Sequence, residues 1–303
     1  MGLRLLVASP IRLRVFVEPG TDPLIDLDAL AQAASCLEPL PVSTLRLARL
    51  VCSGGDSPDI ARVVEVVQFD QALTSSLLRA ANSSWSASRS EITNVHDAVV
   101  RLGTGPVFSM ALGVQVKARL SEPVPEYGLG ESDLWNHSVA ASLAAELVVR
   151  TSPRQLPLET VTASLLHDVG KLVMSRFLSS ELLHRLEASR SAGKTRMEAE
   201  SDVLGVHHAE LGGLILQCWA LPEGLVRGVT YHHQPDVSIN PVAYGVHLAD
   251  VAAKRLVGGD DDNADPEMLD NALGELELSG VQFDEICGLV ETRFCEVLEQ
   301  FAA

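Results

Sequence analysis

Residues 163–174 read ASLLHDVGKLVM. The apolar residues before His167 predict a buried helix, and that helix places an imidazole and a carboxylate side by side at His167 and Asp168. About 100° of rotation separates neighbours on a helix. A short Asp and a longer His at adjacent positions still reach the same ion. Asp168 could also bridge to a second ion, and Gly170 and Lys171 follow directly.

The helical pattern extends over most of the chain. Hydrophobic residues make up 47% of the 303 residues and aromatic residues only 4%, so Leu, Val and Ala supply the bulk, as is typical of packed helices. Residues 27–120 are helical in pattern throughout, and 106–120 are nearly apolar, as expected for a central helix. We therefore expect an all-α, multi-helix bundle, with further helices at 133–150, 158–168, 171–178, 197–204, 207–219, 222–233 and 241–256.

Turn-forming and charged stretches divide this helical chain. Residues 1–25 read as an N-terminal extension, in which 11–18 alternates apolar and charged residues like a short strand. The main domain is expected at 26–257, with the loop 121–130 joining an N-terminal half, 26–120, to a second half, 131–257. Residues 258–303 are expected to form an acidic linker and a C-terminal helix.

Composition excludes several kinds of partner. The formal net charge of −17 argues against duplex nucleic acid and anionic membranes, which both attract cationic surfaces. The five cysteines are scattered and lack CxxC spacing, so they read as reduced residues of a cytosolic protein. No apolar run is long enough to span a bilayer. The sequence therefore predicts a cytoplasmic protein, in which a nucleotide ligand would need a local cationic site such as a metal.

Other His and Asp residues recur around the opening stretch, most of them on separate predicted helices with small or apolar neighbours. If these helices converge, imidazole nitrogens and carboxylate oxygens meet at one point, a mixture that suits Fe, Mn, Zn or Mg, in one or two ions. The candidate metal ligands are His137, His167, Asp168, His208, His232, His233 and Asp250.

Each candidate also has an ordinary explanation. A single His on an apolar helix is usually a hydrogen-bonded core residue, and Asp250 has Lys254 one turn away as an ion-pair partner. Gly170 is a candidate for a left-handed residue that ends a helix. The His232–His233 pair could be cationic at a helix end, where the helix dipole favours positive charge. The seven residues in this order are stronger evidence for a metal site than any one of them alone.

That ordered set, H…HDxGK…HxxxG…HH…D, resembles the HD superfamily of metal-dependent phosphohydrolases. The upstream stretches PLPVSTLRLARLV, VVQFDQALTSSLLRAANSSW and ITNVHDAVVRLGTGPVFSMALG are similar to the first half of an HDOD domain, a bacterial branch of that superfamily. Together with HHAELGGLILQCWALPE and HLAD, the resemblance covers roughly residues 30–256.

The resemblance implies an all-helical protein of signalling and regulation that binds a protein partner or a small ligand. Lys171 matches the lysine that lies near the substrate phosphate in active relatives, so Lys171 and Asp168 would be the catalytic residues of an active enzyme. His232 or His233, where not a ligand, would protonate the leaving group. The GYP triplet of the cyclic-di-GMP phosphodiesterase branch is absent, since HHQPDVSINP follows the histidine pair.

Three functions therefore stay open. The first is a regulatory module with a retained metal site and a signalling partner. The second is a metal-dependent phosphohydrolase that acts on a nucleotide or second messenger. The third is a purely structural helical protein whose histidines belong to the core.

Overall fold

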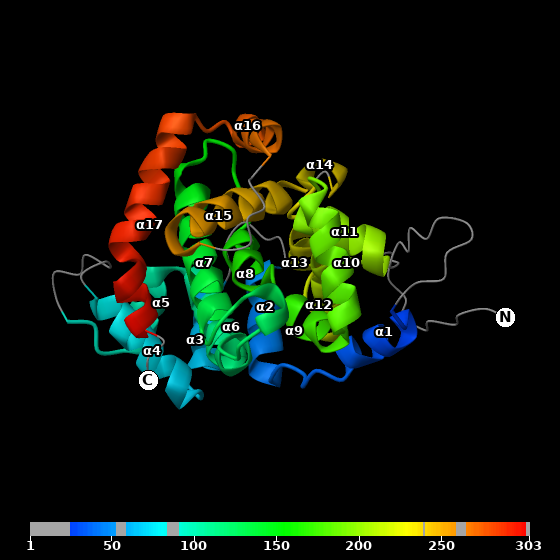
Figure 1. Ribbon diagram of the computed structural model, residues 1–303. Helices are drawn as coiled ribbons and strands as arrows, with labels where there is room; N and C mark the ends of the chain where they lie inside the picture. The colour runs from blue at the N-terminus through cyan, green and yellow to red at the C-terminus, as the bar shows by residue number, and fades with distance from the viewer. Residues whose placement is uncertain (1–24, 53–58, 84–90, 239, 259–264, 301–303) are drawn as a thin grey trace.

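The computed structural model describes residues 25–52, 59–83, 91–238, 240–258 and 265–300. Every regular element in these ranges is a helix, and their only bridge of the β type is the isolated pair Val124–Leu129. The expected all-α fold is therefore confirmed (Figure 1). The strand expected at 11–18 lies outside the described residues.

The N-terminal helices are short, and polar caps start several of them. The carboxylate of Asp26 accepts hydrogen bonds from two first-turn N–H groups, and Asp59, Asp70 and Asn94 each cap a later helix in the same way. The helices are α1 (Leu27–Ser35), α2 (Val42–Cys52), α3 (Ile60–Val67), α4 (Gln71–Asn82), α5 (Val95–Leu102) and α6 (Thr104–Leu120).

The second half surrounds the two long helices α7 and α15, which pack side by side at the centre of the molecule (Figure 1). Its helices are α7 (Asp133–Thr151), α8 (Glu159–Leu166), α9 (Lys171–Met174), α10 (Ser180–Ser191), α11 (Arg196–Leu204), α12 (His208–Cys218), α13 (Glu223–Thr230), α14 (Pro235–Ser238), α15 (Pro241–Val257), α16 (Pro266–Glu275) and α17 (Gly280–Gln300), with 3-10 turns η2 (Pro125–Tyr127) and η3 (Ser175–Phe177).

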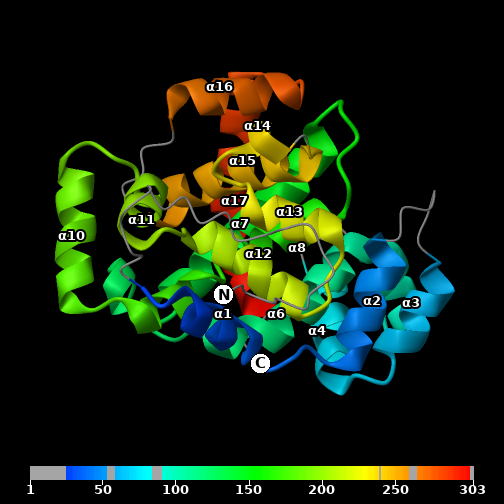
Figure 2. The ribbon, with the colours of Figure 1, turned by 90° about the vertical axis from the view of Figure 1, so that its right-hand side faces the viewer.

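Three helices were absent from the sequence prediction, among them the four-residue α14. α10 buries only Leu182 and Leu186 and lies at the edge of the molecule beside α11 (Figure 2), so its apolar pattern is weak. α16 begins inside the stretch that was expected to be an acidic linker. Asp265 caps it and Pro266 occupies its first turn, a combination that signals a helix start.

The opening stretch is also less regular than predicted. α8 ends at Leu166, and residues 167–170 form a tight turn that leads into α9. The predicted helix 171–178 is α9 followed by η3. His167 and Asp168 therefore sit at a buried corner between two helices rather than within one.

The two halves are packed against each other through α6, which is buried along most of its length and contacts α2, α4, α7 and α8. One hydrophobic cluster extends from Ile25 to Val246 and so includes residues of both halves. A second cluster joins α7 and α15 to α16 and α17. α1 belongs to the N-terminal half by sequence, but it packs against α9 and α12 of the second half.

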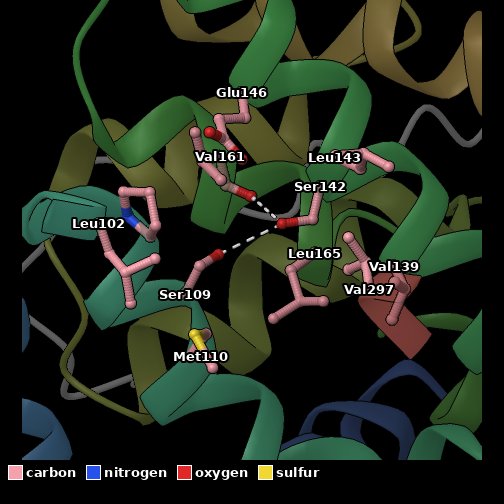
Figure 3. Close-up of a pocket in the computed structure, with 11 residues that line it drawn as sticks. Leu102, Ser109, Met110, Val139, Ser142, Leu143, Glu146, Val161, Leu165 and Val297 are labelled. Atoms are coloured by element: carbon pink, nitrogen blue, oxygen red, sulfur yellow. Dashed lines mark hydrogen bonds between the residues drawn. The ribbon is translucent and has the colours of Figure 1, made fainter. Parts of the chain in front are cut away.

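A small cavity of about 50 Å³ lies where α6, α7, α8 and α17 meet (Figure 3). Most of its lining is apolar, with one hydroxyl chain across it. Ser142 donates to the carbonyl of Val161 at 3.2 Å, so Ser109, 3.3 Å from the Ser142 oxygen, is the donor of the second bond. Both serine hydroxyls at this cavity therefore have hydrogen-bond partners within the protein.

No single helix among the described residues is long and apolar enough to cross a membrane. α5 and α6 together reach the required length and composition, but they are bent by 109° relative to each other.

Candidate metal centre

The fold brings the seven candidate ligands together from five segments of the second half. His137 lies on α7, the pair 167–168 at the corner after α8, His208 at the start of α12, the pair 232–233 just after α13, and Asp250 on α15. Six of the seven are buried and His233 is half-buried. They form three groups of three whose potential ligand atoms lie within 4.8 Å of one another, and one of these groups, His167, Asp168 and His232, overlaps the other two.

The first group consists of His137, His167 and Asp250. Nε2 of His137 lies 3.2 Å from Nε2 of His167 and 3.0 Å from Oδ1 of Asp250. Nε2 of His167 is 3.5 Å from the same carboxylate oxygen. Two imidazoles and a carboxylate at this spacing are ligands that first-row divalent metals accept.

The second group consists of His208, His232 and His233. Nε2 of His208 is 2.9 Å from Nε2 of His233, and the ring centroids of His208 and His232 are 5.9 Å apart. This group is all imidazole, whereas the first contains a carboxylate. The two groups therefore offer different donor sets.

Asp168 lies between the two groups. Its Oδ2 is 3.4 Å from His167 Nε2 and 3.7 Å from His137 Nε2, while its Oδ1 is 3.4 Å from His208 Nε2. One carboxylate oxygen thus faces each group. This is the position of a carboxylate that bridges two ions.

Hydrogen bonds orient the imidazoles with Nε2 toward the cluster. Nδ1 of His167 donates to the carbonyl of Ser164 at 2.7 Å, and Nδ1 of His232 donates to that of Val229 at 2.7 Å. A carbonyl only accepts, so each Nδ1 carries a proton and Nε2 is left as the ligand atom. Nε2 of His232 is buried and has no hydrogen-bond partner among the described residues. The donor set and this orphaned nitrogen fit a divalent cation.

Burial and the neighbouring carboxylates shift the pKa values of these histidines in opposite directions. Burial lowers the pKa of His137, and it lowers those of His232 and His233 far below the usual value. The neighbouring Asp168 and Asp250 carboxylates instead outweigh burial at His167 and raise its pKa to about 10, so a metal would have to displace a proton from its Nε2. The low pKa values of His232 and His233 disfavour the alternative of a cationic pair at a helix end.

Two lysines neutralise the aspartates. Burial alone raises the pKa of Asp168, but Lys171, with Nζ 2.8 Å from Oδ2, holds this pKa well below its usual range. Lys254 does the same for Asp250, also at 2.8 Å. The alternative of an Asp250–Lys254 ion pair is thus confirmed, and Asp250 contacts the histidines as well.

Gly170 has a packing role rather than a left-handed conformation. Its φ is −62°, so the expectation of a left-handed helix end was wrong. A Cβ on Gly170 would lie 1.9 Å from the His208 carbonyl oxygen and 2.7 Å from the backbone nitrogen of Gly212. Only a glycine lets the corner at 167–170 approach α12 closely enough to join the two groups.

A cavity of about 440 Å³ opens beside the first group. His137, Asp168 and both lysines line it, together with the ring of Tyr127 and residues of the loop 121–130. A ligand in this cavity would lie beside residues of the candidate metal centre and beside the ammonium groups of Lys171 and Lys254.

Sequence reasoning missed residues that surround the ligands. Glu200 hydrogen-bonds His208, Tyr127 hydrogen-bonds Glu200, and Nδ1 of His247 donates to the carbonyl of His232 at 2.9 Å. Glu200 is a single acid in an ordinary helical pattern, and Tyr127 lies in a loop. Arg196 precedes Glu200 by four residues, so the sequence explains Glu200 as an ordinary helical ion pair and gives no signal of its contact with His208.

The sequence profile of the HDOD domain matches residues 37–235, and the chain belongs to that family. An uncharacterised protein of Treponema pallidum (strain Nichols) is 23% identical over 208 residues, which cover 68% of this chain and 39% of the relative. The chain thus matches less than half the length of that relative.

Crystal structures share the fold. An HDOD domain protein of unknown function from Geobacter sulfurreducens superposes with a TM-score of 0.65 at 21% identity, covering 91% of this chain and 98% of its own. A protein provisionally named a phosphohydrolase, from Shewanella amazonensis SB2B, gives 0.64 at 22%, covering 90% and 97%. A protein provisionally named a signal transduction protein, from Marinobacter aquaeolei VT8, gives 0.65 at 21%, covering 93% and 67%.

Proposed function

We propose that this HDOD protein is a bacterial, cytoplasmic regulatory module whose centre holds two divalent ions and takes an anionic small ligand beside them. Occupancy of the centre would then control binding of a protein partner in a signalling pathway. The observation that carries the proposal is the pair of ligand groups with one oxygen of Asp168 facing each.

The N-terminal half supports the regulatory role. It contributes no residue to the candidate metal centre, and among its described residues it exposes large apolar side chains, with Val42 at 82% and Phe69 at 81% exposure. Single exposed apolar side chains are ordinary on a protein surface, so this assignment rests on the absence of candidate ligands from the described residues of this half. The second half would therefore bind the small ligand and the first half the partner.

Metal content tests the centre directly. We expect the purified protein to contain up to two Fe, Mn or Zn ions per chain by elemental mass spectrometry, and His167→Ala and Asp168→Ala to lose most of them. His184→Ala, at an exposed position on α10, is the control and should keep the wild-type content. A protein that stays metal-free after incubation with each ion would contradict the proposal.

A phosphohydrolase is the second candidate, and the contact of Lys171 with Asp168 at the wall of the cavity favours it. Bound divalent ions would supply Lewis-acid activation of water and phosphate. Lys171 would offset negative charge on the phosphoryl oxygens, and whichever of His232 and His233 is not a ligand would protonate a leaving group.

A screen of metal-loaded protein with nucleotide and cyclic-nucleotide phosphoesters separates the two functions. Turnover that disappears in Asp168→Ala would establish the enzyme. Metal binding without turnover would favour the regulatory module.

A further inference from the structure

Glu200, on α11, is not one of the seven candidate ligands, yet its carboxylate is bonded to one of them. Its Oε2 accepts hydrogen bonds from the backbone N–H of His208 at 2.8 Å and from Nδ1 of the same residue at 2.7 Å. Its Oε1 accepts from the hydroxyl of Tyr127 at 2.9 Å and lies 3.7 Å from Nε of Arg196. Glu200 is fully buried, so water does not compete for these bonds.

This arrangement decides which nitrogen of His208 is free. A carboxylate accepts hydrogen bonds, so Nδ1 of His208 carries the proton and Nε2 keeps the lone pair that faces Asp168 and His233. Backbone carbonyls perform the same task for His167 and His232. Of these three histidines, His208 has a charged side chain as its partner, and a charged acceptor makes the imidazole a stronger ligand.

Tyr127 connects this pair to the segment between the two halves. It belongs to η2, and two cations lie over its ring: the guanidinium of Arg196, 4.3 Å from the ring centroid, and the ammonium of Lys171, at 5.5 Å. The ring also lines the 440 Å³ cavity. Its hydroxyl therefore holds Glu200 from the side on which a ligand would enter.

We propose that Glu200 is a positioning residue of the metal centre, which fixes the tautomer and orientation of His208, with Tyr127 completing its hydrogen bonding. The inference rests on the proposed metal centre. An alternative is that Glu200 only caps the start of α12 and pairs with Arg196. The two roles predict different results when Gln replaces Glu200 and the negative charge is lost. The positioning role predicts a change in the His208 tautomer, and the capping role predicts none.

The test compares Glu200→Gln with wild type in two measurements on the full chain. In chelator competition with Zn²⁺, we expect the variant to bind about 10–100-fold more weakly, as is usual when such a partner is lost. Tyr127→Phe keeps the ring, so its zinc affinity should fall by a few-fold at most. Glu146→Gln, which removes a buried carboxylate away from the centre, should keep the wild-type affinity even if it is less stable.

The second measurement does not depend on metal. ¹⁵N NMR of the imidazoles in metal-free protein should show the Nδ1–H tautomer for His208 in wild type and a mixture in Glu200→Gln. If a folded Glu200→Gln keeps both the tautomer and the zinc affinity, the inference is wrong and Glu200 is a cap. If wild type binds no zinc, the proposed metal centre fails, and the tautomer alone decides whether Glu200 orients His208.

Discussion

Lys171 and Lys254 show how single charges prepare the centre for an anion. Each ammonium lies 2.8 Å from an aspartate of the centre, and each lines the cavity. If a metal ion binds the two aspartate carboxylates, the ammonium groups of the two lysines can pair with an anionic ligand instead. The sequence motif identified Lys171, whereas Lys254 was seen only as an ion-pair partner.

Lys171→Met should weaken binding of inorganic phosphate to the zinc-loaded protein by at least about tenfold, since a charge-assisted hydrogen bond contributes about 1.5–3 kcal/mol. Isothermal titration calorimetry measures this. Lys194→Met, which removes an exposed lysine that pairs with Asp202, is the matched control. Equal phosphate affinity in both variants would remove Lys171 from the ligand site.

Glu210 gives a pH dependence of stability. Burial raises the pKa of its carboxyl group to about 7, from an ordinary value of 4.5. Between these two values the folded state binds more protons than the unfolded state, so stability falls as pH rises and the whole penalty is present above pH 7. Glu210→Gln removes the ionisation while keeping an acceptor for the N–H of His207.

Relative to wild type, Glu210→Gln should therefore gain about 1–3 kcal/mol in free energy of unfolding between pH 5 and pH 8. Urea unfolding in the presence of chelator checks this without a contribution from metal. Glu198→Gln, at an exposed position on α11, should show no such gain. A constant difference at both pH values would mean that Glu210 ionises normally in the fold.

The corner between α8 and α9 depends on Gly170. A methyl group there meets the backbone of α12, which cannot move aside as a flexible side chain can. Gly170→Ala should therefore cost about 3 kcal/mol or more and lower metal content together with stability, because the two ligand groups move apart. Thermal unfolding and elemental analysis of the same samples measure both effects.

Gly288→Ala is the matched control for this prediction. Gly288 lies inside α17 and a Cβ there meets nothing within 4 Å. Alanine should stabilise the protein by about 0.5–1 kcal/mol through helix propensity. If Gly170→Ala is as stable as wild type, the backbone at 167–170 shifts to accommodate a methyl group, and the prediction is wrong.

Helices were predictable where their apolar faces are wide. α6, α7, α12 and α15 are buried along most of their length, and their positions follow from the sequence pattern to within a few residues. α10 was missed because two buried leucines are too few to mark a face. The end of α8 was also misplaced, since residues 167–170 are as buried as the helix before them and no residue before Gly170 signals a helix end.

The shared core joins the two halves and predicts a single unfolding transition. Phe108 on α6 is fully buried within the cluster that includes residues of both halves. Phe108→Ala should therefore cost about 3–5 kcal/mol and move the far-UV circular dichroism and tryptophan fluorescence transitions together.

Phe69→Ala is the control, because the same change at an 81% exposed phenylalanine should leave stability nearly unchanged. Two separated transitions in Phe108→Ala would show that the halves unfold independently despite their common core.

Helix patterns and motif spacing are local properties, so the sequence by itself was enough to predict the helical class and the family and to select seven candidate ligands that the fold brings together. Which oxygen of Asp168 faces which histidine, why Gly170 must be small, and how Glu200 and Tyr127 support His208 depend on helices distant in sequence. Those contacts arise only when the chain is packed, since burial selects hydrogen-bond partners that sequence distance does not reveal.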